Sequence, residues 1–130
     1  MTGETNLIAR DYHKAMNPFF GTTEIGSWVN GAMMPGTGDM FELIDPATGK
    51  AFLALKDAGA DVVNAAMDAA IAGQKVWWGM TGAERGRIMW RIRQLVRDQL
   101  EDLALLETVS AGKPIRDTRV EVLKVAEMFE

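Results

Sequence analysis

The chain has 130 residues, of which 48% are hydrophobic and 25% are charged, and its formal net charge is −4. This size and composition indicate one globular domain, and the acidic balance argues against a nucleic-acid partner. No run approaches the roughly 20 apolar residues of a membrane helix, and the N-terminus lacks a secretory core, so we expect no membrane association and a cytoplasmic location. Without cysteine, these residues form no disulfide, thiolate metal site or thiol nucleophile.

Residues 1–24 lack a regular pattern, because Pro18 and Gly21 interrupt any periodicity. We interpret this segment as a partly irregular N-terminal extension. His13 is the only histidine and has no adjacent acidic pair, so a solvated side chain is a better interpretation than a catalytic or metal-binding one.

The first regular segments are predicted to be strands. Residues 25–30 form a short strand that ends at an Asn-Gly turn pair, and residues 33–39 form a loop. The GTGD of this loop superficially resembles a phosphate loop, but a strand follows where a phosphate loop needs a helix. Residues 40–45 and 51–55 flank Pro-Ala-Thr-Gly, which predicts a tight hairpin.

Residues 59–80 are predicted to form an alanine-rich helix that begins at Gly59. Asp61 suits its N-terminal end. We expect its buried positions to include the small and branched residues Val62, Ala66, Ala69, Ala70 and Val76. Trp77 and Trp78 are interpreted as core anchors near its end.

The segment 81–114 predicts two helices, a stop and a restart. Thr81 and Glu84 have the spacing of a capping box. One apolar stripe follows at helical spacing (Ile88, Ile92, Leu95, Val96 and Leu100), and a second set follows it (Leu103, Leu105, Leu106 and Val109). Gly112 is a natural stop, and Pro114 suits the first turn of a new helix.

The last helix is expected to run to Glu130, with Val120, Leu123 and Met128 on one face and Val122 and Val125 beside it. No glycine, asparagine or proline ends this pattern. A truncated chain explains this, and a frayed natural terminus is the alternative.

Four blocks of this sequence resemble the aldehyde dehydrogenase superfamily. Residues 81–85 (TGAER) and 107–114 (ETVSAGKP) are similar to its Ser-Pro-Ala-Glu-Arg and Glu-Thr-hydrophobe-x-x-Gly-Lys-Pro blocks. Residues 45–50 (DPATGK) are similar to its Asn-Pro-Ala-Thr-Gly-Glu turn, and residues 28–31 (WVNG) to its Trp-hydrophobe-Asn-Gly strand. The resemblance implies that residues 25–130 are the incomplete N-terminal part of the nucleotide-binding domain of an α/β protein, an antiparallel ribbon followed by about four packed helices.

The resemblance also implies a chemistry. In the complete enzyme a cysteine thiolate attacks the aldehyde, hydride passes to NAD or NADP, and a glutamate activates the water that releases the carboxylic acid. This chain contains neither that cysteine nor a nucleotide-binding glycine motif, so we expect no bound cofactor and no activity from it alone. The implied partners are the rest of the polypeptide and further copies in a homo-dimer or homo-tetramer.

Several positions are candidate sites by the same resemblance. A monovalent cation would involve the backbone of Leu43 and Ile44 and the side chain of Ser110, a weak ligand for a hard cation. Val122, Val125 and Met128 would lie near the substrate entrance, and they are as readily core residues. Glu107 and Glu121 are more simply interpreted as capping or intrahelical pairing residues than as catalytic acids.

Two alternatives remain open at this stage. The arginines between 85 and 97 would suit a phosphate or nucleic-acid patch, but nearby acids favour a solvated, ion-paired face. The chain would also suit a stand-alone helical interaction module derived from the same family, which binds a partner through an exposed apolar surface.

Overall fold

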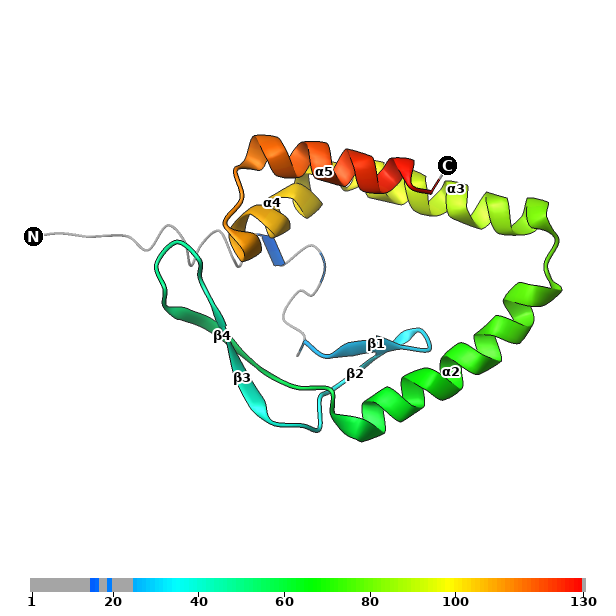
Figure 1. Cartoon of the computed structure of the whole chain (residues 1–130), viewed down its shortest axis with the longest axis horizontal. Coiled ribbons are helices and arrows are strands. Elements are labelled where there is room, and N and C mark those ends of the chain that lie inside the picture. The colour runs from blue at the N-terminus through cyan, green and yellow to red at the C-terminus, as the bar shows by residue number, and fades with distance from the viewer. Residues whose placement is uncertain (1–14, 17–18, 20–24, 130) are drawn as a thin grey trace, which may run out of the picture. The chain divides into compact units, whose positions relative to one another are not determined.

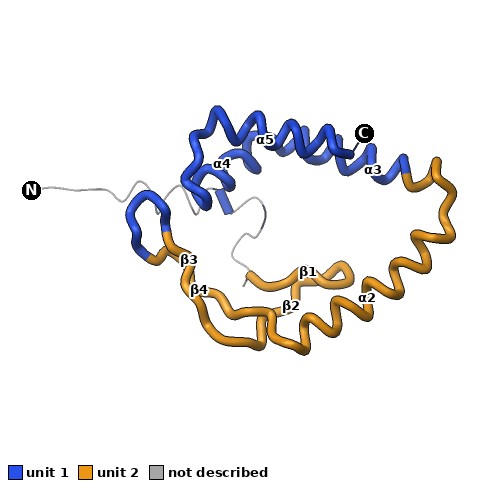
Figure 2. Tube along the Cα trace, viewed as in Figure 1, with its two compact units in different colours: residues 1–22, 45–50, 86–130 blue, residues 23–44, 51–85 orange. Residues whose placement is uncertain are grey.

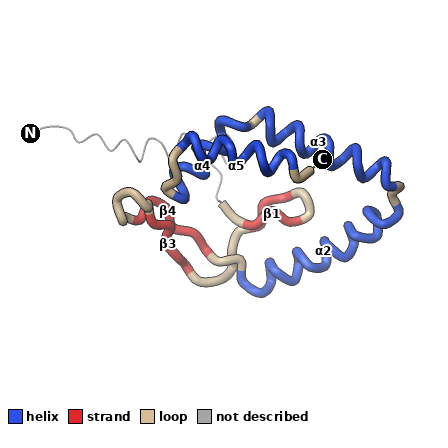
Figure 3. Tube along the Cα trace, turned by 45° about the horizontal axis from the view of Figure 1, so that its top comes forward, coloured by secondary structure: helices blue, strands red, loops and turns tan. Residues whose placement is uncertain are grey.

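The computed structural model describes residues 15–16, 19 and 25–129. Among these, two antiparallel hairpins are followed by four helices (Figures 1 and 3). The predicted ribbon followed by about four helices is therefore confirmed, with a second hairpin ahead of the predicted one. His13 and most of the predicted extension lie outside the described residues.

The chain divides into two compact units (Figure 2). Unit 1 contains residues 1–22, 45–50 and 86–130, and unit 2 contains residues 23–44 and 51–85. Each unit therefore combines segments that are distant in the sequence.

The first hairpin pairs β1 (Ser27–Val29) with β2 (Ala32–Met34) in unit 2. Asn30 and Gly31 join them with φ angles of 50° and 81°, the left-handed pair that a two-residue hairpin turn requires. The predicted turn is confirmed. The loop predicted from residue 33 begins too early, because Met33 and Met34 pair with Trp28 and Ser27.

The second hairpin pairs β3 (Met40–Ile44) with β4 (Ala51–Lys56), as predicted. The buried Asp45 organises the turn between them, because its carboxylate accepts hydrogen bonds from the Ala47 amide at 2.8 Å and the Thr48 hydroxyl at 2.6 Å. Gly49 supplies the left-handed residue of this turn, with φ of 68°.

Helix α2 (Gly59–Gly79) covers the first hairpin with its N-terminal half. Val62 is only 3% exposed, which confirms its predicted core position. The predictions for Val76 and for the two tryptophans are wrong, because Val76 is 64%, Trp77 36% and Trp78 80% exposed. In unit 2 the main contact of α2 is with the short strand β1, so its last turns extend beyond the elements that would bury them.

Helix α3 (Gly82–Asp98) begins at the predicted capping box. Thr81 donates its amide to Glu84 at 2.7 Å, and the Glu84 amide donates to the Thr81 hydroxyl at 3.3 Å. The predicted stripe has helical spacing but is not buried, because Ile88 is 38% and Leu95 50% exposed.

Helices α4 (Leu100–Ala111) and α5 (Ile115–Glu127) pack against each other in unit 1. Gly112 ends α4 with φ of 72°, and Pro114 precedes α5, so the predicted stop and restart are confirmed. The buried face of α5 differs from the predicted one. It consists of Thr118, Val122 and Ala126, whereas Val120 is 50% and Met128 82% exposed.

Candidate functional site

The connection between α4 and α5 holds several side-chain hydrogen bonds of unit 1. Gly112 lies so close to the turn of the second hairpin that an added Cβ would stand 3.1 Å from Pro46 Cβ and Cγ. Its positive φ and this close contact both favour glycine. Two blocks that the sequence resemblance singled out, the 45–50 turn and the Gly-Lys-Pro turn, therefore meet in the structure.

Lys113 bridges the two helices that flank this connection. Its ammonium Nζ donates to Glu107 Oε1 at 2.9 Å and to Glu121 Oε2 at 2.8 Å. The bond to Glu121, followed by that to Glu107, raises the pKa of Lys113 above its usual range. The predicted capping or intrahelical roles of the two acids are wrong, because both bind a residue outside their own helices. Lys113 belongs to the 107–114 block of the sequence resemblance, but residue spacing alone does not predict its bonds to Glu107 and Glu121.

Two further residue pairs link α4 to α5. Arg119 donates from Nε and Nη2 to the Glu101 carboxylate at 2.7–3.0 Å, and this bond lowers the pKa of Glu101. Thr108 and Thr118 join their hydroxyls at 2.9 Å, and Thr118 in turn donates to the Ile115 carbonyl at 3.0 Å. Because Thr118 is fully buried, this pair fixes the spacing of the two helices.

Of the three predicted entrance residues, two lie on α5, and Met128 is the residue that follows its last turn. Val122 is 9% exposed and packs in the core of unit 1. Val125 and Met128 are 45% and 82% exposed. Their assignment to a substrate entrance stays a prediction.

The predicted cation ligands are distributed over both units. Leu43 and Ile44 lie in β3, where the strand pairing shifts register between them, and they belong to unit 2. Ser110 is exposed on α4 in unit 1, where its hydroxyl lies 3.5 Å from the Glu107 carbonyl. The cation site also stays a prediction.

The arginines of α3 have separate roles. Arg85 donates to the Met80 carbonyl at 2.6 Å and thereby joins the end of α2 to the start of α3. The Arg93 guanidinium lies 4.5 Å from the centre of the Trp90 ring, a cation–π contact. Arg87, Arg91 and Arg97 are exposed. This separation favours a solvated face over one phosphate-binding patch.

The glycines of the 35–39 loop pack against backbone and do not form a cradle for a phosphate. A Cβ at Gly36 would overlap the Lys56 and Asp57 carbonyls. The amides of Thr37 and Gly38 donate to the Ala58 and Asp57 carbonyls at 3.1 and 3.0 Å. The predicted plain loop is confirmed, and its amides do not fit a dinucleotide phosphate.

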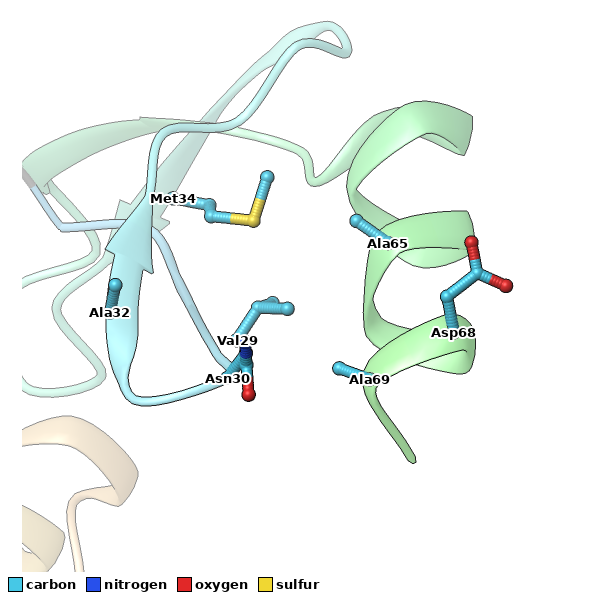
Figure 4. A pocket seen from close by; sticks show the side chains of 7 residues that line it. All are labelled: Val29, Asn30, Ala32, Met34, Ala65, Asp68 and Ala69. Carbon is cyan, nitrogen blue, oxygen red and sulfur yellow. The ribbon is translucent and has the colours of Figure 1, made fainter. Parts of the chain in front are cut away.

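A shallow, mostly apolar hollow lies between the first hairpin and α2 in unit 2 (Figure 4). Val29 and Met34 face Ala65 and Ala69 across it. The small alanines leave this space, and no charged side chain points into it, since Asp68 extends to one side. The hollow offers packing volume but no group for acid–base or nucleophilic chemistry.

The part of the chain that the structure describes holds no group of three His, Asp or Glu side chains placed to bind a metal ion. In the same part, no helix is long and apolar enough to span a bilayer.

Comparison with known proteins places these features in a family context. The model of the aldehyde dehydrogenase family matches residues 33–130. The crystal structure of HpcC from Thermus thermophilus is 26% identical, with a TM-score of 0.80 over 92% of this chain and 23% of its own. An NAD-dependent aldehyde dehydrogenase from Sinorhizobium meliloti is 25% identical (TM-score 0.72, 98% and 24% covered). An E. coli NADP-dependent enzyme is 29% identical (TM-score 0.75, 82% and 22% covered). The chain spans about a quarter of the length of these relatives.

Proposed function

The chain belongs to the aldehyde dehydrogenase family, and we propose that it is the N-terminal portion of an NAD(P)-dependent enzyme that oxidises an aldehyde to a carboxylic acid. The family match over residues 33–130 carries this proposal. The names of the relatives support a nicotinamide cofactor and include both NAD and NADP. In the complete enzyme we expect a cytoplasmic homo-dimer or homo-tetramer.

The role we propose for these residues is that of a scaffold. The chain has no cysteine, so the thiolate nucleophile comes from outside these 130 residues. The cofactor supplies the hydride acceptor when the complete enzyme binds it. The residues described here hold the α4–α5 connection against the 45–50 turn and thereby present a fixed surface to the remaining three quarters of the fold.

A chimera tests this role. Residues 33–130 replace the matching segment of the Sinorhizobium meliloti enzyme, and NADH formation from an aldehyde is followed by absorbance. We expect a folded chimera that reduces NAD. The matched control carries the corresponding segment of the Thermus thermophilus protein. If the control is active while the chimera is folded and inactive, the proposed role is contradicted.

The isolated chain provides the second arm of the test. Because it lacks the nucleophile, we expect no NADH or NADPH when it is mixed with an aldehyde and either cofactor. Turnover by the purified chain would show that the chemistry does not depend on the family's cysteine and would contradict the proposal.

A second candidate function is a stand-alone interaction module of the same ancestry. The observation that favours it is the exposure of large apolar side chains on several elements, such as Met40 at 61% and Met128 at 82%. In that case the isolated chain would be stable and monodisperse, and the chimera would lack activity.

A further inference from the structure

Helix α2 has two apolar faces, and only one of them is covered within its unit. Ala65 and Ala69 lie toward the first hairpin (Figure 4), and Val62 is buried at 3% exposure. Another side carries four large side chains that are 51–80% exposed: Val63, Met67, Ile71 and Trp78. At about 100° per residue these four fall within an arc of roughly 80°, and we call them the α2 stripe.

The α2 stripe is suited to packing against another helix. Single exposed apolar residues are common on protein surfaces, but a row of four on one helix face is typical of an interaction site. Ala66 and Ala70 lie beside the row, and their small side chains allow the backbone of a second helix to approach closely.

The charges along one flank of the stripe indicate what kind of helix fits. Asp61, Asp68 and Lys75 follow one another at seven-residue spacing and therefore lie on the same flank of α2. In a parallel pair of α2 helices, the two-fold axis would place the two flanks that carry Asp68 and Lys75 on opposite sides, so these charges would not meet. In an antiparallel pair that crosses near Ile71, each Asp68 faces a Lys75, and the two helix dipoles are also opposed.

We propose that the α2 stripe is the docking surface for a second copy of this chain, with the two α2 helices antiparallel. Ile71 of each copy meets the other near the centre of the pair, and Trp78 lies over Val63 and Ala66 of the second copy. A helix of 21 residues is about 31 Å long. A contact between two single helices is a small interface, so we expect a weak, concentration-dependent dimer.

Sedimentation velocity of the 130-residue chain over a range of concentrations tests the surface. We expect a monomer–dimer equilibrium that Ile71→Glu weakens at least tenfold. The matched control is Val76→Glu, which places the same charge on the same helix roughly 140° away from Ile71, at a position 64% exposed. It should leave the dimer intact. Far-UV circular dichroism checks that both variants retain their helices.

Charge reversal tests the orientation. Asp68→Lys should weaken the antiparallel dimer, and Lys75→Asp added to it should restore the dimer. In a parallel pair these flanks would not meet, so Asp68→Lys would leave the dimer unchanged. A monomeric wild-type chain, a dimer or larger aggregate insensitive to Ile71→Glu, or a double variant that stays as weak as Asp68→Lys would each overturn the proposal.

Discussion

Two glycines of α2 differ in whether the structure can accommodate a side chain at their positions. Gly59 has a φ of 75°, and a Cβ there would overlap Thr37 Oγ1 and lie 3.0 Å from the Gly38 amide nitrogen. We therefore expect Gly59→Ala to lower the free energy of unfolding by about 1–3 kcal/mol, since both backbone strain and steric overlap oppose it. Urea unfolding followed by circular dichroism measures this loss.

Gly73 is the matched control for that substitution. It lies inside the same helix, and an added Cβ would meet nothing within 4 Å. Gly73→Ala is expected to raise the free energy of unfolding by about 0.5–1 kcal/mol, because alanine loses less backbone entropy in a helix. If the two variants changed stability in the same direction, the assignment of Gly59 to a strained, crowded position would be wrong.

The capping box of α3 gives a pH dependence. Hydrogen bonds from the Thr81 amide and then the Thr81 hydroxyl lower the pKa of Glu84 below its ordinary value of 4.5. A lowered pKa in the folded state means that the bond stabilises the fold above pH 4.5 and is lost as the pH falls through the folded-state pKa. We expect Thr81→Ala to cost about 1 kcal/mol at pH 7 and less at a pH below the folded-state pKa of Glu84. Urea unfolding at the two pH values checks this, and an equal cost at both would contradict it.

Local spacing made the capping box predictable, because all its atoms belong to residues three positions apart. The partners of Lys113 were not predictable in this way. Glu107 and Glu121 are six and eight residues away and meet only after the chain turns at Gly112. Asp45 was missed for a related reason, since its burial depends on the turn that its own carboxylate organises.

At the scale of helices, the bond between Thr108 and Thr118 connects α4 to α5. Thr118→Val removes a buried hydroxyl, and the Thr108 hydroxyl then loses its hydrogen-bond partner. We therefore expect the free energy of unfolding to fall by about 1–3 kcal/mol. Replacing both threonines by valine should cost less than the sum of the single changes, because no polar group is then left unpaired. A double-mutant cycle by thermal or urea unfolding measures the coupling, and strict additivity would contradict it.

Hydrophobic periodicity alone predicts the wrong buried face for α5. The structure buries Thr118 and Ala126 and leaves Val120 and Met128 exposed. Close contact with α4 favours small side chains and a paired hydroxyl, which hydrophobic periodicity does not detect. The exposure of Trp78 has a different origin, since the main contact of α2 within unit 2 is with the short strand β1.

For the molecule as a whole, the order of hairpins and helices could be predicted from turn residues and periodicity. The division into two units could not, because each unit joins segments that are far apart along the chain. We expect this division to be visible in hydrogen exchange. Gly59→Ala should accelerate exchange in unit 2 peptides more than in those of α4 and α5, and Thr118→Val should do the reverse. Mass spectrometry of peptic fragments measures this, and uniform acceleration in both variants would indicate a single cooperative unit.

The contact between Pro46 and Gly112 bears on how the chain folds during its synthesis. The 45–50 turn leaves the ribosome well before Gly112 is synthesised. The nascent hairpin therefore forms before the α4–α5 connection that its turn contacts. Contacts between distant residues slow folding, and unpaired hairpin edges exposed in the interval invite association with other chains. The Asp45 carboxylate, which closes the turn with residues only two and three positions ahead, lets that hairpin keep its shape until the later helices emerge.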